Sequence, residues 1–211
     1  MRYSPEHKQK TREKVVQAAS KVFRQQGYHA AGVDRVMEEA GLTAGAFYAH
    51  FPSKEALFSE AFTCASQEAA RLNLGGLDSR SGKDWIVGFL ERYLSPLHRR
   101  MVVEGCPIPA LASEISRAGD GPRLAFEEAI VAQAEKLGRH LPEAGDLDRE
   151  SNALAIIALC VGGLSLARAV TDEALADRIL EACRALALQG QEGSAADVKN
   201  ESRPDSNIVN E

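Results

Sequence analysis

Residues 43–54 place small side chains, hydrogen-bond donors and one cation at the spacing of two short helical segments. Thr43 is a good N-cap, and it predicts a helix from about Ala44 to His50. Tyr48 and His50 carry donors that can reach phosphate oxygens. The remaining outward residues are small, so the helix can lie close to another surface: Ala44, Gly45, Ala46 and Ala49. The chemistry on offer is non-covalent binding to a nucleic acid.

A second anion site is predicted directly after this helix. Pro52 and Ser53 restart a helix, with Ser53 as the N-cap. Lys54 and the free backbone N–H groups of that helix start offer positive charge to a phosphate. Phe47 and Phe51 are four residues apart, so they can face the core together while the polar residues point elsewhere.

Two helices and a glycine turn must position these groups. The spacing of Val33, Val36, Met37 and Ala40 is that of one buried helical face. Gly41 follows where a helix ends in a left-handed residue, a conformation that costs glycine little. Two helices joined by such a turn form a helix-turn-helix, whose second helix can enter the DNA major groove. A small bundle with ordinary core aromatics is the alternative, which the full order of turn, N-cap, aromatics and Pro-Ser-Lys disfavours.

From about Thr11 to Phe58 the chain resembles the N-terminal DNA-binding domain of the tetracycline repressor (TetR) family. The segment covers about a quarter of the chain, and its motif set is specific. The matching residues are Val15, Ala18, Ala19, Phe23, Gly27, Tyr28, Val36, Ala40, Gly41, Gly45, Phe47, Tyr48, His50, Phe51, Lys54 and Leu57.

The resemblance implies an all-α fold: a three-helix DNA-binding domain followed by a helical domain for ligand binding and dimerisation. It implies a homodimeric repressor that binds a palindromic operator and is released by a small-molecule effector. In the family, the positions of Thr43, Gly45, Tyr48, His50 and Lys54 commonly touch DNA. We add their neighbours on the same helix to the expected contacts, Ala44 and Ala46.

Four positions depart from the family pattern. Ala44 and Ala46 stand where longer or hydroxyl-bearing residues are frequent, and Met37 replaces a usual alanine. Gly32 stands where Ser or Thr often caps the second helix. These departures leave the operator sequence open. They also lend slight support to an alternative, an interaction adaptor of the same fold that has lost specific DNA binding.

The charge distribution favours DNA contact at one end of the chain. The net charge is −5, but residues 1–58 hold nine Lys or Arg against six Asp or Glu, a net of +3 that leaves −8 for the rest. Up to Arg24 the count is seven against two. A basic head on an acidic body steers one end of the molecule toward DNA.

Composition disfavours other classes of protein. Cys64, Cys106, Cys160 and Cys183 lack metal-ligand spacing, so we expect no metal and a reducing cytoplasm. The sequence lacks a phosphate loop, a dinucleotide fingerprint and a nucleophile motif, so we expect neither an enzyme nor a cofactor. The N-terminus is charged rather than apolar, so no signal peptide is expected. The uncharged run at 153–167 is shorter than the roughly 20 residues that span a bilayer, so a buried helix is expected and no membrane partner.

Hydrophobic periodicity predicts helices throughout and no strands. The domains expected are 1–58 for DNA binding, 59–188 for effector binding and dimerisation, and a disordered tail at 189–211, with the helix from Ser53 running across the first boundary. The helices are expected at 8–26, 33–40, 44–50, 53–72, 83–102, 107–117, 121–140, 148–170 and 172–188. The last two carry matching apolar faces, and two such pairs would form a four-helix dimer interface.

An effector cavity is expected between the C-terminal helices. Its candidate lining is Trp85, Phe89, Tyr93, Met101, Cys106 and Phe126. These residues could equally fill the core, because core and pocket aromatics share the same spacing. Cys106 precedes a predicted helix start, where a thiolate is favoured, so an electrophile or redox sensor is a further alternative. The inert interpretation is preferred, since free cysteines are commonly buried.

Overall fold

The structure, a computed structural model, describes residues 4–141 and 148–191. All regular structure in these two ranges is helical, which confirms the all-α prediction. In chain order the elements are α1 (Pro5–Gln26), α2 (Val33–Glu39), the short 3₁₀ helix η1 (Ala44–Ala49), α3 (Lys54–Leu74), α4 (Gly82–Tyr93), α5 (Pro96–Arg100), α6 (Ile108–Ile115), α7 (Asp120–Gly138), α8 (Arg149–Ala169) and α9 (Glu173–Gln189). Of the tail predicted from residue 189, positions 192–211 lie outside the described residues.

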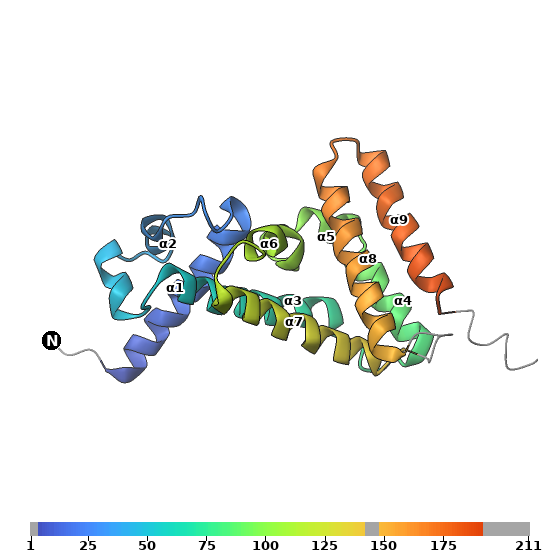
Figure 1. Ribbon diagram of the computed structural model, residues 1–211, viewed down its shortest axis with the longest axis horizontal. Coiled ribbons are helices and arrows are strands. Elements are labelled where there is room, and N and C mark those ends of the chain that lie inside the picture. The colour runs from blue at the N-terminus through green and yellow to red at the C-terminus, as the bar shows by residue number, and fades with distance from the viewer. Residues whose placement is uncertain (1–3, 142–147, 192–211) are drawn as a thin grey trace, which may run out of the picture.

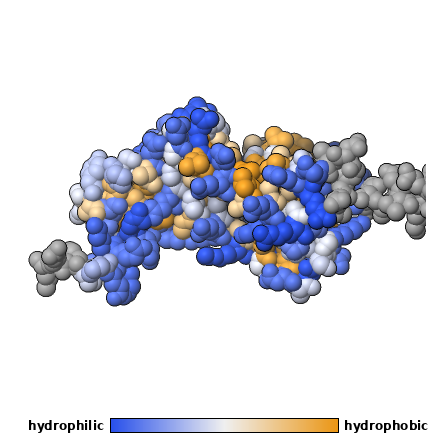
Figure 2. All heavy atoms as spheres, turned by 60° about the horizontal axis from the view of Figure 1, so that its bottom comes forward, coloured by the Kyte–Doolittle hydropathy of each residue, from blue (hydrophilic) through white to orange (hydrophobic). Residues whose placement is uncertain are grey.

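The first three elements form a small N-terminal bundle at one end of an elongated molecule (Figure 1; Figure 2 shows the surface of the turned molecule). Ser4 caps α1 by accepting a hydrogen bond from the His7 N–H at 3.2 Å. Gly27 ends α1 with φ 82°, and Gly41 takes φ 70° in the turn after α2. Both angles are in the region that favours glycine, and the angle at Gly41 confirms the predicted turn after α2. The turn therefore sets α2 and η1 against each other.

Helix α3 connects this bundle to the rest of the chain. It begins in the N-terminal bundle and runs beside α7 along the underside of the molecule in Figure 1. Ser53 caps it as predicted, accepting from the Ala56 N–H at 3.0 Å. A movement of α7 relative to α3 would thus reach the N-terminal bundle through a continuous helix.

The single helix predicted at 83–102 is wrong, because the chain forms α4 and α5 there with a break between them. Proline lacks an N–H and pushes the residue before it out of the helical region. Ser95, which precedes Pro96, is accordingly extended at φ −121° and ψ 152°. Ser95 then caps α5 by accepting from the His98 N–H at 3.0 Å.

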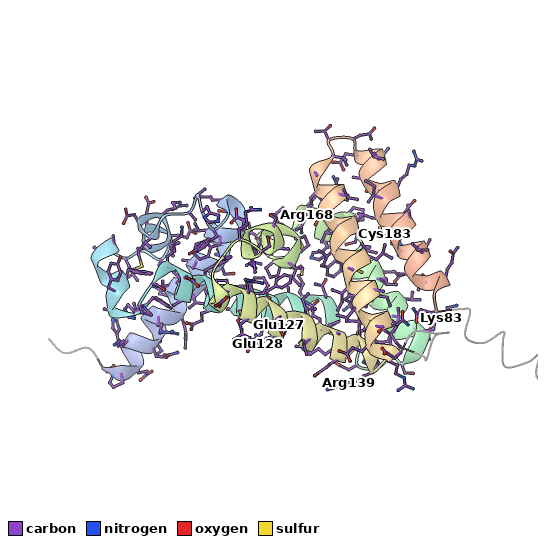
Figure 3. The ribbon with its side chains drawn as sticks, in the orientation of Figure 1. Lys83, Glu127, Glu128, Arg139, Arg168 and Cys183 are labelled. Carbon is purple, nitrogen blue, oxygen red and sulfur yellow. The ribbon has the colours of Figure 1, made fainter. Side chains whose placement is uncertain are left out.

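Helices α8 and α9 form a hairpin at the end of the molecule away from the N-terminal bundle (Figure 1). Asp148 and Asp172 cap their first turns, at 2.7 Å to the Ser151 N–H and 3.1 Å to the Leu175 N–H. A Cβ on Gly163 would lie 2.6 Å from the Sγ of Cys183, so glycine permits this close packing. Figure 3 places Cys183 on α9 and Arg168 near the end of α8.

Helix α8 is long and apolar enough to cross a membrane by length and composition alone, and 44% of its most apolar window is buried inside the chain. Among the described residues it is the one helix that meets this test. In general, a core helix that has one uncovered face also passes this test of length and composition. Its partly buried state agrees with the predicted packing of α8 against other helices.

Candidate DNA-binding interface and effector cavity

The predicted second helix of the helix-turn-helix is a six-residue 3₁₀ helix, η1, rather than an α-helix. Ala46 N–H donates to the Thr43 carbonyl at 3.0 Å and His50 N–H to the Phe47 carbonyl at 2.9 Å, both with 3₁₀ spacing. Thr43 is extended, as an N-cap residue should be, but its side chain makes no capping hydrogen bond. The structure therefore confirms the predicted start of the helix and Thr43 as its N-cap residue, while the helix is of the 3₁₀ type, ends at Ala49 and lacks a side-chain capping bond.

Two buried aromatic residues hold η1 against the N-terminal bundle. Phe47 and Phe51 are each 1% exposed, and their rings stack with centroids 5.9 Å apart. Tyr48 lies next to Phe47 in sequence and is 76% exposed. Anchoring one face in this way turns the opposite face outward. The exposed residues on that face are Thr43, Ala44, Gly45, Tyr48 and Ala49.

Ala46 and His50 lie at the edge of this outward face. Ala46 is half-buried and packs against the core. His50 is also half-buried, and its Nδ1 atom is shielded with no hydrogen-bond partner among the described residues. Burial lowers the pKa of His50, and the nearby cations Lys8 and Arg12 lower it further. His50 therefore favours the neutral form, in which one ring nitrogen is a donor.

Lys54 lies in the first turn of α3, as predicted, but its ammonium rests on an aromatic ring. The Nζ atom is 4.5 Å from the ring centroid of Tyr28, a cation–π distance. Burial lowers the pKa of Lys54, while Glu114 acts in the opposite direction. Lys54 is the first residue of α3, so it belongs to the same turn as the free backbone N–H groups of that helix start.

The basic count of the N-terminus overstates the charge that is free to face DNA. Arg24 is buried, and Arg12 forms an ion pair with Glu60 while lying 4.6 Å from the Phe51 ring centroid. Lys10 pairs with Glu6 at 2.8 Å. Lys14 and Lys21 are exposed on α1 and form no ion pair within the ranges that the structure describes. Sequence alone counted these cations as equivalent.

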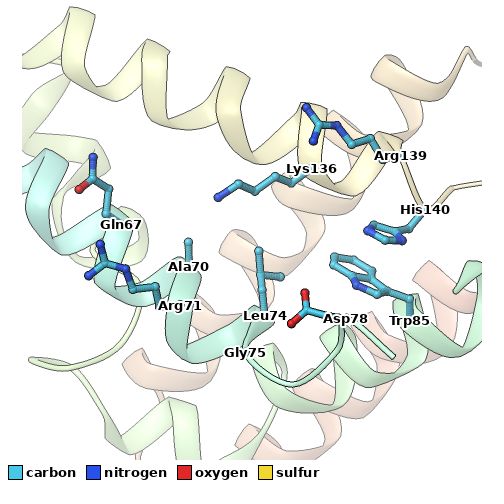
Figure 4. Close-up of a pocket in the computed structure, with 10 residues that line it drawn as sticks. All are labelled: Gln67, Ala70, Arg71, Leu74, Gly75, Asp78, Trp85, Lys136, Arg139 and His140. Atoms are coloured by element: carbon cyan, nitrogen blue, oxygen red, sulfur yellow. The ribbon is translucent and has the colours of Figure 1, made fainter. Parts of the chain in front are cut away.

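The six residues predicted to line one effector cavity are divided among several places. Trp85 borders an open cleft of about 500 Å³ between α3, α4 and α7 (Figure 4). Phe89, Tyr93 and Cys106 line a small internal cavity between the same helices, whose volume of about 20 Å³ has room for roughly one water molecule. Met101 lies in a separate depression near α5. Phe126 packs on Phe62, with ring centroids 5.8 Å apart, and it lines none of these three cavities.

Helical spacing did not reveal the polar residues of the same region. Arg71, Lys136 and Arg139 border the open cleft, with Asp78 as the acidic member. His140 covers Trp85 there, with ring centroids 4.0 Å apart and planes 4° from parallel. No sequence motif marks these residues, because they come together only when α3 and α7 pack side by side.

Cys106 lies in the core. Its side chain is 1% exposed, and burial raises the pKa of its thiol, although the neighbouring Tyr93 hydroxyl acts in the opposite direction. A reactive cysteine needs exposure and a lowered pKa. Both observations agree with the inert interpretation and give the sensor alternative no support.

An exposed short helix, anchored by buried aromatics on a glycine turn and carried by a helical body, defines a helix-turn-helix protein. Residues 15–61 match the family described as bacterial regulatory proteins, tetR family. The transcriptional regulator LmrA of Bacillus subtilis is 30% identical over 163 residues, which cover 74% of this chain and 85% of LmrA. The regulator YxaF of the same organism is 29% identical over 160 residues, covering 74% and 84% of the two chains.

Solved structures agree with the sequence comparison. A TetR transcriptional regulator from Chloroflexus aurantiacus superimposes with a TM-score of 0.73 at 28% identity, covering 87% of this chain and 95% of that one. A regulator from Cytophaga hutchinsonii gives 0.74 at 22% identity, covering 91% and 98%, and it supports the fold. The chain belongs to the tetR family of helix-turn-helix transcriptional regulators, a family of DNA-binding proteins that typically act as dimers and are not enzymes.

Proposed function

We propose that this regulator is a repressor that binds a palindromic operator as a homodimer in the cytoplasm and is released by a small-molecule effector. The observation that carries the proposal is the outward face of η1. It presents an exposed Tyr48 beside small residues on a helix fixed from behind by Phe47 and Phe51. A face of that shape can approach base edges while Tyr48, His50 and Lys54 reach phosphates.

The dimer is proposed to form through α8 and α9. Four leucines on these helices are between 40% and 60% exposed in the single chain: Leu154, Leu166, Leu175 and Leu186. On α8 they flank Ala158 and Gly162, which are also exposed and permit a close approach of another helix. Burying this face in a four-helix interface removes apolar surface from water. Two reading heads spaced about 34–36 Å apart would then contact successive major grooves.

Two links are proposed to carry the effector signal to DNA. Helix α3 spans both parts of the chain, as the sequence suggested. The second link joins α1 and its following turn to α6. Arg24 of α1 donates to the Gly105 carbonyl oxygen in the loop before α6, and the Tyr28 N–H donates to Glu114 of α6. An effector that binds one arrangement of these elements better shifts the population of DNA-competent dimers.

Selection of bound sequences from random DNA, followed by titration with the full chain, tests the proposal. A palindromic consensus is expected, with tighter binding than to unrelated DNA. Tyr48→Phe should weaken binding to all sequences without altering thermal stability, because the hydroxyl belongs to an exposed side chain. A chain that stays dimeric and folded but ignores every oligonucleotide at low salt would instead be the adaptor alternative.

A further inference from the structure

One lysine joins three adjoining cavities along the contact between α3 and α7. Lys136 borders the open cleft, a groove of about 240 Å³ between the two helices, and the small internal cavity. Ala70, opposite on α3, borders the same three. Figure 4 shows Lys136 extending from α7 across the cleft toward α3. We call these three spaces together the α3–α7 seam.

The Lys136 ammonium has no counter-charge within the ranges that the structure describes, since none of their ion pairs includes it. Arg71 and Arg139 stand beside it in the cleft and also lack a carboxylate partner there. Asp78 is the single acidic residue of that lining. The seam thus has an excess of positive charge at its mouth.

Two residues that border the seam carry covered hydroxyl groups without a nitrogen or oxygen partner. Ser66 is 7% exposed and borders the groove, and Tyr93 is 3% exposed and borders the internal cavity. Neither hydroxyl makes a hydrogen bond to oxygen or nitrogen among the described residues, although Tyr93 lies against the weakly polar Cys106 thiol. Buried polar groups are normally satisfied, so each unpaired one calls for an explanation.

Ser66 differs from its neighbours on the same helix. Ser59 and Thr63 both donate to the backbone carbonyl four residues earlier, at 3.2 Å and 3.1 Å, and Asn73 does the same at 2.9 Å. Ser66 makes no such bond. Its hydroxyl therefore has no partner in the ligand-free chain, where its oxygen atom is covered, and a ligand in the groove would have to shift this side chain to reach it.

The rest of the lining combines further polar residues of the groove (Thr63, Gln67 and Gln133) with an apolar wall. The groove is walled by alanines of both helices (Ala70, Ala125, Ala129 and Ala132), and the internal cavity by Phe89 and Leu137. A bare inorganic anion would leave this surface uncovered. Glu128 borders the groove about two helical turns before Lys136, so a bound anion would point its charge toward Lys136. Figure 3 places Glu127 and Glu128 together on α7.

We propose that the effector of this regulator is a small organic anion with an apolar body, bound in the α3–α7 seam. Lys136 binds the anionic group, the alanine-lined groove holds the body, and the Ser66 and Tyr93 hydroxyl groups hydrogen-bond its polar atoms. The proposal rests on the effector-released function proposed above. It also places the ligand next to the small cavity lined by Cys106, whose neighbour Gly105 accepts the hydrogen bond from Arg24 of α1.

Calorimetric titration of the full chain without DNA tests this assignment. The probes are octanoate and cinnamate, each compared with the neutral alcohol of the same skeleton, octanol and cinnamyl alcohol. At least one carboxylate is expected to bind about tenfold more tightly than its alcohol, the effect of one charge-assisted contact. Equal binding of carboxylate and alcohol in both pairs, or no binding of either carboxylate, overturns the proposal.

Three variants locate the site. Lys136→Met keeps the aliphatic stem and should abolish the preference for the carboxylate, whereas Lys21→Met, at an exposed position on α1, should leave it unchanged. Ser66→Ala and Tyr93→Phe should each weaken binding about three- to tenfold. In the ligand-free chain Ser66→Ala should leave the thermal midpoint unchanged or raise it, because it removes an unpaired buried hydroxyl. Tyr93→Phe also loses a weak contact with the Cys106 thiol and should lower the midpoint only slightly. A lower midpoint of Ser66→Ala would assign its hydroxyl a structural role instead.

A separate measurement with the selected operator keeps the two proposals apart. If octanoate or cinnamate binds as described but leaves operator affinity unchanged, the ligand assignment stands and effector release fails. If the operator is bound but Lys136→Met has no effect on carboxylate affinity, the repressor proposal stands and the ligand assignment fails.

Discussion

Arg24 of α1 donates a hydrogen bond from Nη1 to the carbonyl oxygen of Gly105, at 2.9 Å, in the loop before α6. The same guanidinium donates to the carbonyl oxygen and the hydroxyl of Ser20, at 2.9 Å and 2.7 Å. Burial lowers the pKa of Arg24, whereas the nearby carboxylates of Glu68 and Glu104 raise it. The guanidinium nevertheless stays charged, as it does in proteins generally. The helix that leads into the DNA-binding elements is thereby attached to the wall of the proposed effector cavity.

Arg24→Met should destabilise the chain. It keeps most of the aliphatic packing but leaves two carbonyl groups without their charged donor, and such hydrogen bonds contribute about 1.5–3 kcal/mol each. We expect a fall of about 2 kcal/mol or more in the free energy of unfolding, measured by urea denaturation of the full chain at fixed concentration. Lys21→Met, one turn away and exposed, is the matched control and should change it by less than about 0.5 kcal/mol. Equal effects of the two substitutions would show that the link carries no stability.

Lys54→Met should lower the salt dependence of operator binding. Loss of one phosphate contact reduces the slope of log affinity against log salt concentration by about one unit. Lys54→Arg keeps the charge and should keep the slope. The cation–π contact with Tyr28 makes the position of this ammonium defined before DNA arrives. A slope unaltered by Lys54→Met would remove Lys54 from the interface.

The sequence was sufficient to predict the helix-turn-helix because its signals are local. Gly41 has to occupy the left-handed region for α2 to end where it does, and Ser53 has to cap α3. Both requirements can be recognised from a few neighbouring residues. The 3₁₀ geometry of η1 could not be predicted in this way, since over six residues the two helix types differ by only one or two hydrogen bonds.

The effector region was harder to predict because its signal is tertiary. Phe126 and Phe89 have the same helical spacing relative to apolar neighbours, yet Phe126 packs on Phe62 and Phe89 lines a cavity. Lys136 and Ser66 look like ordinary surface residues of two separate helices. Only the packing of α3 beside α7 brings them to one seam. Arg24 was likewise counted with the DNA-facing cations, although it is buried.

Leu166→Glu combined with Leu186→Glu should convert the dimer to a monomer. Both side chains are about 60% exposed in the single chain, so the substitution costs little there, but it buries two charges per chain in the proposed interface. Light scattering after size exclusion should show a halved mass, and operator affinity should fall at least tenfold. Leu97→Glu, equally exposed but on α5, should leave both unchanged. A double variant that stays dimeric would exclude this face.

The pH dependence of stability should contain a contribution from His98. This residue is 3% exposed, its Nδ1 lies 2.8 Å from the Tyr93 carbonyl oxygen, and its Nε2 accepts from the Cys106 N–H at 3.0 Å. Such a pair of contacts requires the neutral ring with the proton on Nδ1. Burial lowers the pKa of His98 below the ordinary 6.5, although the bond to Tyr93 acts in the opposite direction.

The sign follows from proton counting. Below pH 6.5 the unfolded chain binds a proton at His98 while the folded chain does not. The contribution of His98 to the free energy of unfolding is therefore complete above pH 6.5 and is lost as the pH falls toward the lowered pKa of the folded chain. The slope from one such group is at most about 1.4 kcal/mol per pH unit. His98→Gln, which keeps an acceptor for the Cys106 N–H, should be less stable at pH about 7.5 and lose less on acidification. Urea unfolding across this range, with His29→Gln at an exposed loop position as control, measures both effects. Parallel curves for the wild type and His98→Gln would mean that His98 titrates alike in the folded and unfolded chains.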